Sequence, residues 1–570
     1  MIIGIDLGTT NSLVALWIGG VPVLVPNAIG DTLTPSCVGL SESGELLVGR
    51  AARDRLQTHP RLTTANFKRY MGSAREIELG KQKFRPEELS SFVLRSLKAD
   101  AEAFTGELVH EAIISVPAYF SDAQRKATRA AGELAGLSVE RLINEPTAAA
   151  LAYGVRDVGR ERKFLVFDLG GGTFDVSILE IFEGVMEVRA STGDNFLGGE
   201  DFVDMLVEDV LAHAKILEDD LLPSDQQRLR EAVERLKRKL SLESSAELTV
   251  RLSGQDVTYG LTEDRFGALC EPLLQRLRNP VERALRDARI RPSDLHEIVL
   301  AGGATRMPLV RKLVTRMFGR FPASNLNPDE VVALGVAVQA GLKMEDAALD
   351  EVVMTDVCPY TLGINISQQS EASANGWAGG FYMPIIERNT IVPTSRSRDV
   401  YTVHDNQAKL TIDVYQGEGR LVKDNIPLGR FVIDLPPGRL AGQAGANVRL
   451  TYDVNGLLEV EATVHGSDIK GGIVIEEHSG VLSKEEIAVR LKELAHLKLH
   501  PRDDLKNRSL TARANRLFEE SIGPIRMAIS AAITQFETIL GKQDLREISR
   551  AREKLEAWLD RLEQNPFMDA

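Results

Sequence analysis

The spacing of apolar and polar residues divides the chain into three stretches with different predicted structures. Residues 1 to about 345 alternate short apolar runs with amphipathic stretches, which is typical of an α/β protein. Residues 357 to about 480 alternate β-branched and polar residues between Gly, Asn, Asp and Pro, as antiparallel strands do. From residue 483 onward apolar residues recur at helical spacing. We therefore expect an α/β region, a β region and a helical end, in that order.

Several helices can be placed in the α/β region from their end signals. One is predicted from Asp122 to Gly136, because Ser121 or Asp122 can cap its start and Gly136 can end it. A second is the amphipathic run "QQRLREAVERLKRKLS", which ends near Ser241. A third is "MPLVRKLVTRMF", in which Pro308 suits the first helical turn.

The stretch "MEDAALDEVVMTD" (344–356) separates the α/β region from the β region. Charged residues surround a short apolar core and no turn glycine is present. We interpret residues 346–356 as an interdomain linker; the alternative is a helix end followed by an edge strand. This gives four parts, at 1–345, 346–356, 357–480 and 481–570.

Two further predictions concern the C-terminal half. The small polar segment "SQQSEASANGWAGG" (367–380) is typical of a mobile loop. Ser483 and Glu486 form a capping box at the start of the helical end. Three antiparallel helices fit the rest, with breaks predicted at Pro524 and Gly541.

Composition narrows the class of protein. A chain of 570 residues is too long for one core and predicts three or four packing units. The net charge of −14 makes nucleic acid or an anionic membrane a poor partner, and no run of about 18 apolar residues predicts a membrane span. The N-terminus lacks a secretion signal and the three cysteines are widely spaced, so we expect buried thiols in a reducing cytoplasm.

A repeated motif carries the chemistry. "IIGIDLGTTNSLVALWI" near the start and "FLVFDLGGGTFDVSILEI" at 164–181 each read as strand, Asp, Gly-rich turn with hydroxyls, strand. Glycines let backbone N–H groups approach an anion, and the threonines add donors. An acid at the strand end would repel phosphate unless a divalent cation lay between them, and Mg²⁺ held through water suits that role.

A second repeat indicates that the whole unit is duplicated. "EAIISVPAYFSDAQRKA" and "EIVLAGGATRMPLVRKL" both read as strand, tight turn and helix. A nucleotide would lie in the cleft between two such halves, and the opposing hairpins would clamp its triphosphate. The chain lacks the Walker loop, and no G-x-G-x-x-G follows its first strand, so this is neither common phosphate cradle.

These motifs resemble those of the actin/hexokinase/heat-shock ATPase superfamily. "VPAYFSDAQRKAT", "INEPTAAALAYG", "GGEDF", "AGGATRMP" and "NPDEVVALGVAVQAG" narrow the resemblance to the seventy-kilodalton heat-shock chaperones of DnaK type, from residue 1 to about 480. Short segments after Lys68 and after Ser241 point to the HscC-like bacterial branch. The resemblance implies an actin-like (ribonuclease H-like) duplicated ATPase domain, a β-sandwich that binds peptides and a C-terminal helical bundle as its lid.

The resemblance also implies a set of nucleotide-binding residues. The phosphates would lie between two hairpins, and Glu234, Lys237, Arg238 and Ser241 match the family spacing E-x-x-K-R-x-x-S along one helix face. Arg306 would stack on adenine. The full set expected to bind ATP or ADP is Asp6, Gly8, Thr9, Thr10, Asn11, Gly170, Gly171, Gly172, Thr173, Gly198, Gly199, Glu234, Lys237, Arg238, Ser241, Gly302, Gly303, Arg306 and Asp329.

The resemblance implies catalytic and regulatory roles as well. Lys68, Glu145, Asp168 and Thr173 would be catalytic, with Lys68 orienting the attacking water. Asp6, Asp168 and Asp175 would hold Mg²⁺ through water, and K⁺ is a further candidate cofactor. Pro117, Arg125 and Asp356 would relay the state of the cleft to the linker, and Arg141 would dock a J-domain partner. No strong general base is evident, so we expect slow hydrolysis.

The β region would bind extended segments of unfolded clients. The lining residues expected from the match are Ile364, Ile366, Val400, Val403, Leu410 and Ile412; each could instead be ordinary sandwich core. Ser367 stands where the family has a bridging side chain, and the linker reads "EVVMTD" in place of a leucine-rich run. The shorter hairpin after Ser241 predicts fast nucleotide exchange with little dependence on an exchange factor.

Other functions remain open at this point. A small-molecule kinase of the same superfamily would need an acceptor site in the cleft and an aspartate base. A filament-forming, actin-like protein is a second alternative. Both leave residues 357–570 unexplained. The third is a regulator that senses ATP without hydrolysing it.

Overall fold

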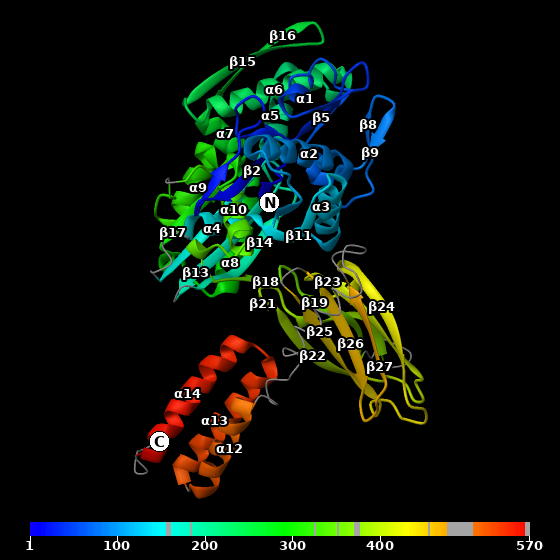
Figure 1. The fold of residues 1–570 in the computed structure, drawn as a ribbon, viewed down its shortest axis with the longest axis vertical. Coiled ribbons are helices and arrows are strands. Elements are labelled where there is room, and N and C mark those ends of the chain that lie inside the picture. The colour runs from blue at the N-terminus through cyan, green and yellow to red at the C-terminus, as the bar shows by residue number, and fades with distance from the viewer. Residues whose placement is uncertain are drawn as a thin grey trace. The chain divides into compact units, whose positions relative to one another are not determined.

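The protein divides into two compact units, residues 1–359 and 360–570 (Figure 1). The structure is a computed structural model, and it describes residues 1–154, 161–182, 185–323, 326–349, 353–369, 377–453, 456–475, 505–521 and 523–564. Among these residues no helix is long and apolar enough to cross a membrane.

The first sheet of the N-terminal unit has the order β11-β10-β1-β2-β3. β1 pairs antiparallel with β2 and parallel with β10, so the chain leaves β1 through a tight turn and returns through a helix-containing connection. The strands are β1 (Ile2–Asp6), β2 (Asn11–Ile18), β3 (Val21–Leu24), β10 (Glu111–Val116) and β11 (Ser138–Asn144). We call this sheet and its surroundings, up to residue 144, the first lobe.

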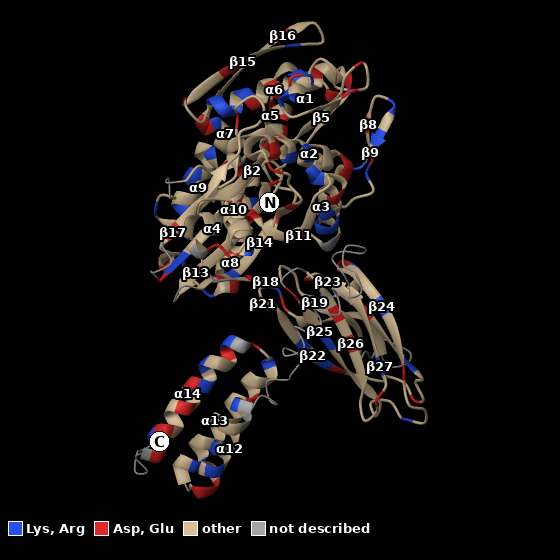
Figure 2. Ribbon diagram, viewed as in Figure 1, with Lys and Arg blue, Asp and Glu red and all other residues tan. Residues whose placement is uncertain are grey.

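The second sheet repeats this arrangement. β12 pairs antiparallel with β13 and parallel with β17, and the order is β17-β12-β13-β14-β18. The strands are β12 (Arg162–Leu169), β13 (Phe174–Phe182), β14 (Val185–Asp194), β17 (Glu297–Ala301) and β18 (Val353–Val357). We call residues 162–323 the second lobe. In the first sheet β2 carries no charged residue, and β1 and β10 carry one each (Figure 2).

Helices cover both sheets, and two of them lie between the lobes. In the first lobe α2 (Pro86–Thr105) and α3 (Asp122–Leu134) pack on each other. α4 (Glu145–Gly154) and α10 (Val331–Lys343) contact each other; α10 packs on strands of the first sheet, and α4 contacts strands of both sheets. Gly335 must be glycine there, since an added Cβ would lie 1.7 Å from the carbonyl oxygen of Ala148.

The second lobe has the larger hydrophobic core, which α5, α6 and α8 share with its sheet. Its helices are α5 (Gly199–Ala214), α6 (Pro223–Lys239), α7 (Glu263–Leu269), α8 (Glu271–Ala288) and α9 (Pro308–Phe318). The predicted helices ending near Ser241 and starting at Pro308 are thus confirmed, as is the helix capped by Ser121, with Gly136 at φ +74° just beyond its end.

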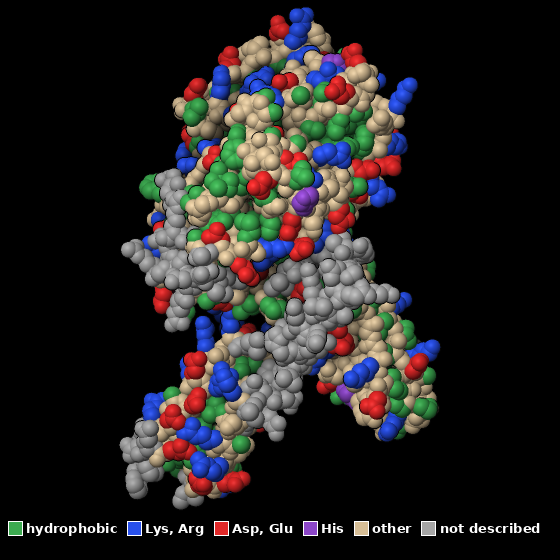
Figure 3. Space-filling model, viewed as in Figure 1, with side chains coloured by type: hydrophobic (Ala, Val, Ile, Leu, Met, Phe, Trp, Pro, Cys, Tyr) green, Lys and Arg blue, Asp and Glu red, His purple; other side chains and the backbone are tan. Residues whose placement is uncertain are grey.

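Small elements complete the N-terminal unit. They are β4 (Thr34–Pro35), β5 (Cys37–Leu40), β6 (Leu46–Val48), α1 (Arg50–Arg53), β7 (Thr63–Ala65), η1 (Phe67–Tyr70), β8 (Ile77–Leu79), β9 (Gln82–Phe84), β15 (Ser245–Leu252) and β16 (Gln255–Thr262), with the 3₁₀ turns η2 (Glu218–Asp220), η3 (Pro292–Asp294), η4 (Gly303–Arg306) and η5 (Ala347–Leu349). Acidic and basic side chains are interspersed over the face of this unit in Figure 3. All three cysteines are buried, and none of them forms a disulfide.

The C-terminal unit contains two four-stranded sheets, in the orders β20-β19-β23-β24 and β22-β25-β26-β27. Every strand pair in them is antiparallel. The strands are β19 (Leu362–Gln369), β20 (Trp377–Ile386), β22 (Thr394–Tyr401), β23 (Lys409–Gln416), β24 (Ile426–Asp434), β25 (Gly445–Tyr452), β26 (Leu458–Val464) and β27 (Lys470–Ile475), with the short β21 (Ile391–Val392) and η6 (Val422–Asp424) between them.

Three helices follow: α12 (Leu505–Glu520), α13 (Gly523–Lys542) and α14 (Leu545–Gln564). Leu510, Phe536 and Leu559 belong to the small core that they share. The helix breaks predicted at Pro524 and Gly541 lie within two residues of the observed ones, because α13 starts at Gly523 and runs to Lys542, and the chain turns at Gln543, which has φ +57°. The capping box predicted at Ser483 and Glu486 lies outside the described residues.

Two other predictions differ from the structure. The loop predicted at 367–380 is strand at both ends, because Gln368 pairs with Ala378 and Gln369 with Trp377. Residues 370–376 lie outside the described residues. Within the segment interpreted as a linker, residues 353–357 form β18, which pairs parallel with β14 in the second sheet.

Candidate nucleotide-binding site

A cavity of about 440 Å³ lies between the two lobes, a size usual for small-molecule sites. Both predicted hairpins, the helix face of α6 and the η4 turn line it. The predicted residues that line it are Asp6, Gly8, Thr9, Thr10, Asn11, Lys68, Glu145, Asp168, Gly170, Gly171, Thr173, Gly199, Glu234, Lys237, Arg238, Ser241, Gly302, Gly303, Arg306 and Asp329.

The first hairpin connects β1 to β2 and is held by serines of its own lobe. The N–H of Gly8 donates to Ser12 Oγ at 3.2 Å, and Ser12 Oγ lies 2.8 Å from Ser36 Oγ. Ser36 Oγ donates to the carbonyl oxygen of Gly8 at 2.7 Å. Gly8 has no room for a side chain, because an added Cβ would lie 2.0 Å from the carbonyl oxygen of Asn11. The turn is therefore fixed before any ligand binds.

The second hairpin connects β12 to β13 and rests on the start of α5. The N–H of Gly199 donates to the carbonyl oxygen of Gly170, and that of Glu200 to Gly171, each at 2.9 Å. Asp201 closes the helix end by accepting the N–H of Gly198 at 2.7 Å. The hairpin and the helix N-terminus thus form one rigid piece.

The two hairpins approach each other across the lobes. A Cβ added to Gly171 would lie 2.1 Å from Thr10 Oγ1. Their backbones therefore face the same small volume from opposite sides. This is the arrangement that clamps a polyanion between main-chain N–H groups.

Lys68 is buried at this meeting point. It lies in η1, and its Nζ donates to Glu145 Oε1 at 2.7 Å. Lys68 is 3% exposed and Glu145 8%, and Glu145 is the first residue of α4. This ion pair fixes the position of the lysine side chain between the two hairpins.

Several buried carboxylates lie in or beside the cavity. Burial, with Glu145 nearby, raises the pKa of Asp6 to about 7 and that of Asp175 to about 8. Burial and the neighbouring carboxylates Glu145, Asp175 and Asp6 raise the pKa of Asp168 well above its ordinary value. Asp168 Oδ2 is buried with no hydrogen-bond partner. One lysine does not balance these charges, so the donor set fits a bound cation.

The carboxylates are too far apart to enclose a metal ion by themselves. Among the described residues, no three His, Cys, Asp or Glu side chains gather closely enough to coordinate one directly. An ion here would keep most of its water, as Mg²⁺ does.

The other end of the cavity is built from α6 and η4. Glu234 pairs with Lys237 at 2.6 Å and with Arg238 at 2.7 Å. Burial opposes ionisation of Glu234, but these two cations outweigh it and lower its pKa. Arg306 Nη2 lies 2.7 Å from Asp329, so its guanidinium is held at the cavity edge. Asp329 does not cap α10, because the N-cap of that helix is Glu330; Asp329 pairs with Arg306 instead.

Three predicted residues lie beside the cavity and do not line it. Gly172 packs under Arg69, and Gly198 is the N-cap of α5. Asp175 is 1% exposed and accepts the N–H of Tyr119 at 3.2 Å.

Sequence reasoning missed other residues of the site. Ser115 donates to Asp6 at 2.7 Å, and Glu200, Leu13, Leu33, Leu242 and Val332 line the cavity. The signal for Ser115 was the parallel register of β1 on β10, which places it beside Asp6.

Two of the residues predicted to act as a relay, Arg125 and Asp356, are connected through Asn144. Arg125 donates to the carbonyl oxygens of Phe120 and Ala118 and to Asn144 Oδ1, the last at 2.6 Å. Asn144, which the sequence did not indicate, donates to Asp356 at 3.1 Å. Pro117 starts the turn that Arg125 braces. Burial lowers the pKa of Arg141, and Asp356 opposes that shift.

The candidate peptide-binding residues fall into two groups. Ile364 and Ile366 on β19 and Leu410 and Ile412 on β23 alternate with period two, and β19 and β23 are neighbours. The register pairs Ile364 with Val414, so all four lie on one face of that sheet. Val400 lies on β22 of the other sheet and Val403 follows that strand.

Comparison with known proteins gives consistent results. The family model described as "Hsp70 protein" matches residues 2–567. Two relatives named "Chaperone protein DnaK", from Thermotoga petrophila and Thermotoga sp. strain RQ2, are each 41% identical over 530 residues, covering 89% of this chain and 86% of theirs. A match over nearly the whole chain, together with the paired hairpins of the cavity, means that this chain belongs to the Hsp70 family.

Proposed function

We propose that the cavity between the lobes binds Mg-ATP and that ATP hydrolysis controls the affinity of the C-terminal unit for extended apolar peptides. Membership in the Hsp70 family makes the chain an ATP-dependent chaperone and an ATPase. The family also binds ATP or ADP with Mg²⁺, unfolded polypeptides and J-domain partners. The meeting of the two hairpins around Lys68 is the observation that carries the assignment of the site.

In this proposal the chain's own groups act by position and charge. The N–H groups of the two hairpins hold the phosphates, and the ammonium of Lys68 orients the attacking water, with Glu145 fixing that ammonium. Thr173 adds a hydroxyl to the second hairpin. Glu145 is paired with Lys68, and the neighbouring aspartates would hold the waters of the cation. None of these described carboxylates is then left to act as a general base, so we expect slow hydrolysis.

Mg²⁺, when bound, neutralises charge on the phosphates and lowers the barrier to their transfer. Asp6 and Asp168 would hold its waters, and Asp175 lies behind them. The same carboxylates make K⁺ a further candidate. The unpartnered Oδ2 of Asp168 supports an ion on that side of the cavity.

Coupling to the second unit would run through the chain Arg125–Asn144–Asp356. Asn144 is the last residue of β11, and Asp356 lies near the end of β18. A change in the cavity that shifts β11 would therefore alter the pairing of β18 with β14 in the second sheet. Ile364, Ile366, Leu410 and Ile412 would contact the peptide, with Val400 and Val403 at the edge, in a β-sandwich closed by α12–α14 as a lid. Arg141 would dock the J-domain partner.

Two further parts of the proposal concern regulation and location. The compact β15–β16 hairpin supports fast nucleotide release with little need for an exchange factor. Stopped-flow release of a fluorescent ADP that was slow and strongly stimulated by such a factor would contradict this. The three buried thiols support a cytoplasmic protein. Membership of the HscC-like branch stays a prediction.

The deciding experiment is release of a bound fluorescent peptide after ATP addition. We expect ATP to speed release in the wild type and in Lys68→Ala, while Lys68→Ala loses hydrolysis by roughly a hundredfold or more. A peptide affinity that did not change with nucleotide would contradict the proposed coupling between the two units. ATP turnover at the wild-type rate in Lys68→Ala would contradict the proposed position of the ATPase site.

A further inference from the structure

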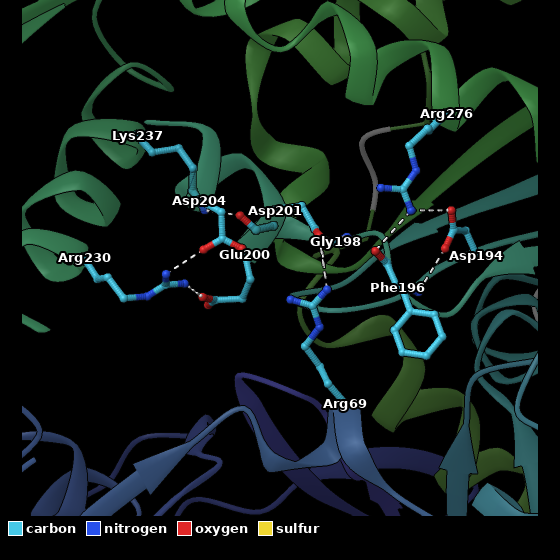
Figure 4. Close-up of polar contacts among 11 residues, drawn as sticks. Arg69, Asp194, Phe196, Gly198, Glu200, Asp201, Asp204, Arg230, Lys237 and Arg276 are labelled. Atoms are coloured by element: carbon cyan, nitrogen blue, oxygen red, sulfur yellow. Dashed lines mark hydrogen bonds and ion pairs between the residues drawn. The ribbon is translucent and has the colours of Figure 1, made fainter. Parts of the chain in front are cut away.

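Arg69 joins the two lobes beside the catalytic lysine. It follows Lys68 in η1, and its Nη2 lies 3.2 Å from both carboxylate oxygens of Asp201, in the second lobe. Both side chains are largely buried, at 17% and 18% exposed. Figure 4 shows Arg69 rising from the η1 turn towards the start of α5.

The arginine stem also packs on the second hairpin. A Cβ added to Gly172 would lie 2.8 Å from Arg69 Cγ and 3.0 Å from Cδ. Its charged end therefore contacts the helix that supports the hairpin, and its stem contacts the hairpin itself. Both contacts belong to the same rigid piece, which Asp201 closes through the N–H of Gly198.

We propose that Arg69 is a positioning residue for ATP hydrolysis, whose pairing with Asp201 sets the second phosphate hairpin against Lys68. This inference rests on the nucleotide site proposed above. It adds a residue of the first lobe that acts on the phosphate groups only through the second hairpin.

The chain order explains why this residue suits the role. Lys68 and Arg69 are consecutive in one short turn, with Lys68 tied to Glu145 and Arg69 to Asp201. Any opening of the lobes that breaks the arginine pair therefore also moves the lysine away from the hairpin. An ion pair this sheltered is stronger than an exposed one such as Arg50–Asp54, whose partners are 61% and 64% exposed.

Another contact between the lobes supplies a matched control. Gln57 Nε2 donates to Glu231 on α6, away from the second hairpin. Gln57→Ala removes a contact between the lobes without touching Gly172 or Asp201. The comparison therefore separates a general loosening of the lobes from a misplaced hairpin.

The test is steady-state and single-turnover ATPase kinetics of the full chain with nucleotide release. We expect Arg69→Ala to lower kcat by roughly tenfold to a hundredfold, the effect of a small misplacement of reacting groups. Gln57→Ala should speed ADP release and leave the single-turnover rate near wild type. Arg69→Lys should recover part of the loss, and Asp201→Asn should add little to Arg69→Ala.

The outcomes separate this inference from the proposed function. A wild-type single-turnover rate in Arg69→Ala, or an equal loss in Gln57→Ala, overturns the role of Arg69 and leaves the nucleotide site standing. Full turnover in Lys68→Ala overturns the site itself. If Arg69→Ala fails to fold, Arg69→Lys and Asp201→Asn decide, since each keeps a side chain of similar size; unchanged rates in both overturn the role.

Discussion

The two hairpins share one sequence design but are held in different ways. The first is closed by Ser12 and Ser36 within its own lobe, so it keeps its shape whatever the other lobe does. The second rests on α5 and, through Arg69, on the opposite lobe. Of the two hairpins, the first is therefore preformed, and the position of the second depends on closure of the cleft. Closure of the cleft would then change the placement of the second hairpin only.

The largest effect is expected when the support of the second hairpin is displaced. In Gly198→Ala the new Cβ would lie 2.4 Å from the nitrogen of Gly172 and 2.5 Å from the carbonyl of Gly171, so the hairpin backbone must move. We expect ATP affinity and turnover to fall roughly a hundredfold. Gly267→Ala in α7, with no atom within 4 Å of its Cβ, is the control. Fluorescent-nucleotide titration measures both, and equal affinities would show that α5 does not hold the hairpin.

Removal of Mg²⁺ should affect both hairpins, because Asp6 ends the strand before one and Asp168 the strand before the other. Without the cation these carboxylates repel the phosphates, so EDTA should weaken ATP binding by roughly tenfold or more. Asp6→Asn should lose less affinity on chelation, since it carries one negative charge fewer. Calorimetric ATP affinity that did not change with EDTA would contradict the cation between strand end and phosphate.

A smaller effect is expected at the serine pair of the first hairpin. Ser36→Ala removes the donor to Gly8 and leaves that carbonyl without its partner. The free energy of unfolding should fall by about 1–2 kcal/mol in chemical denaturation. ATP turnover should stay closer to the wild-type rate than in Arg69→Ala, because the remaining contacts that hold the first hairpin come from its own lobe. Ser43→Ala, at an exposed serine, is the control, and a turnover loss in Ser36→Ala exceeding that in Arg69→Ala would reverse the asymmetry.

The parts of this site that lie close together in the sequence could be predicted from it. Each hairpin is a continuous motif, and Lys68, Glu145 and the α6 residues each stand in a recognisable stretch. Asn144 and the Arg69–Asp201 pair could not be found in this way, because they depend on how β11 meets β18 and how the lobes close. No single segment carries that information.

The predictions that differ from the structure have a similar cause. α13 continues through Gly541 to Lys542, because a glycine costs a helix only about 1 kcal/mol and shared packing around Leu540 holds the helix together. The glycines at 379 and 380 read as loop, yet they lie within β20, at a register shift between residues that pair with β19. In each case contacts with residues distant in the sequence outweighed the local conformational preference of the glycine.

The most direct test of the account is a crystal structure with Mg²⁺ and a non-hydrolysable ATP analogue. We predict backbone N–H groups of both turns, around Thr10 and around Gly171, within about 3 Å of phosphate oxygens. A bound analogue whose phosphates touched only one of the two turns would contradict it.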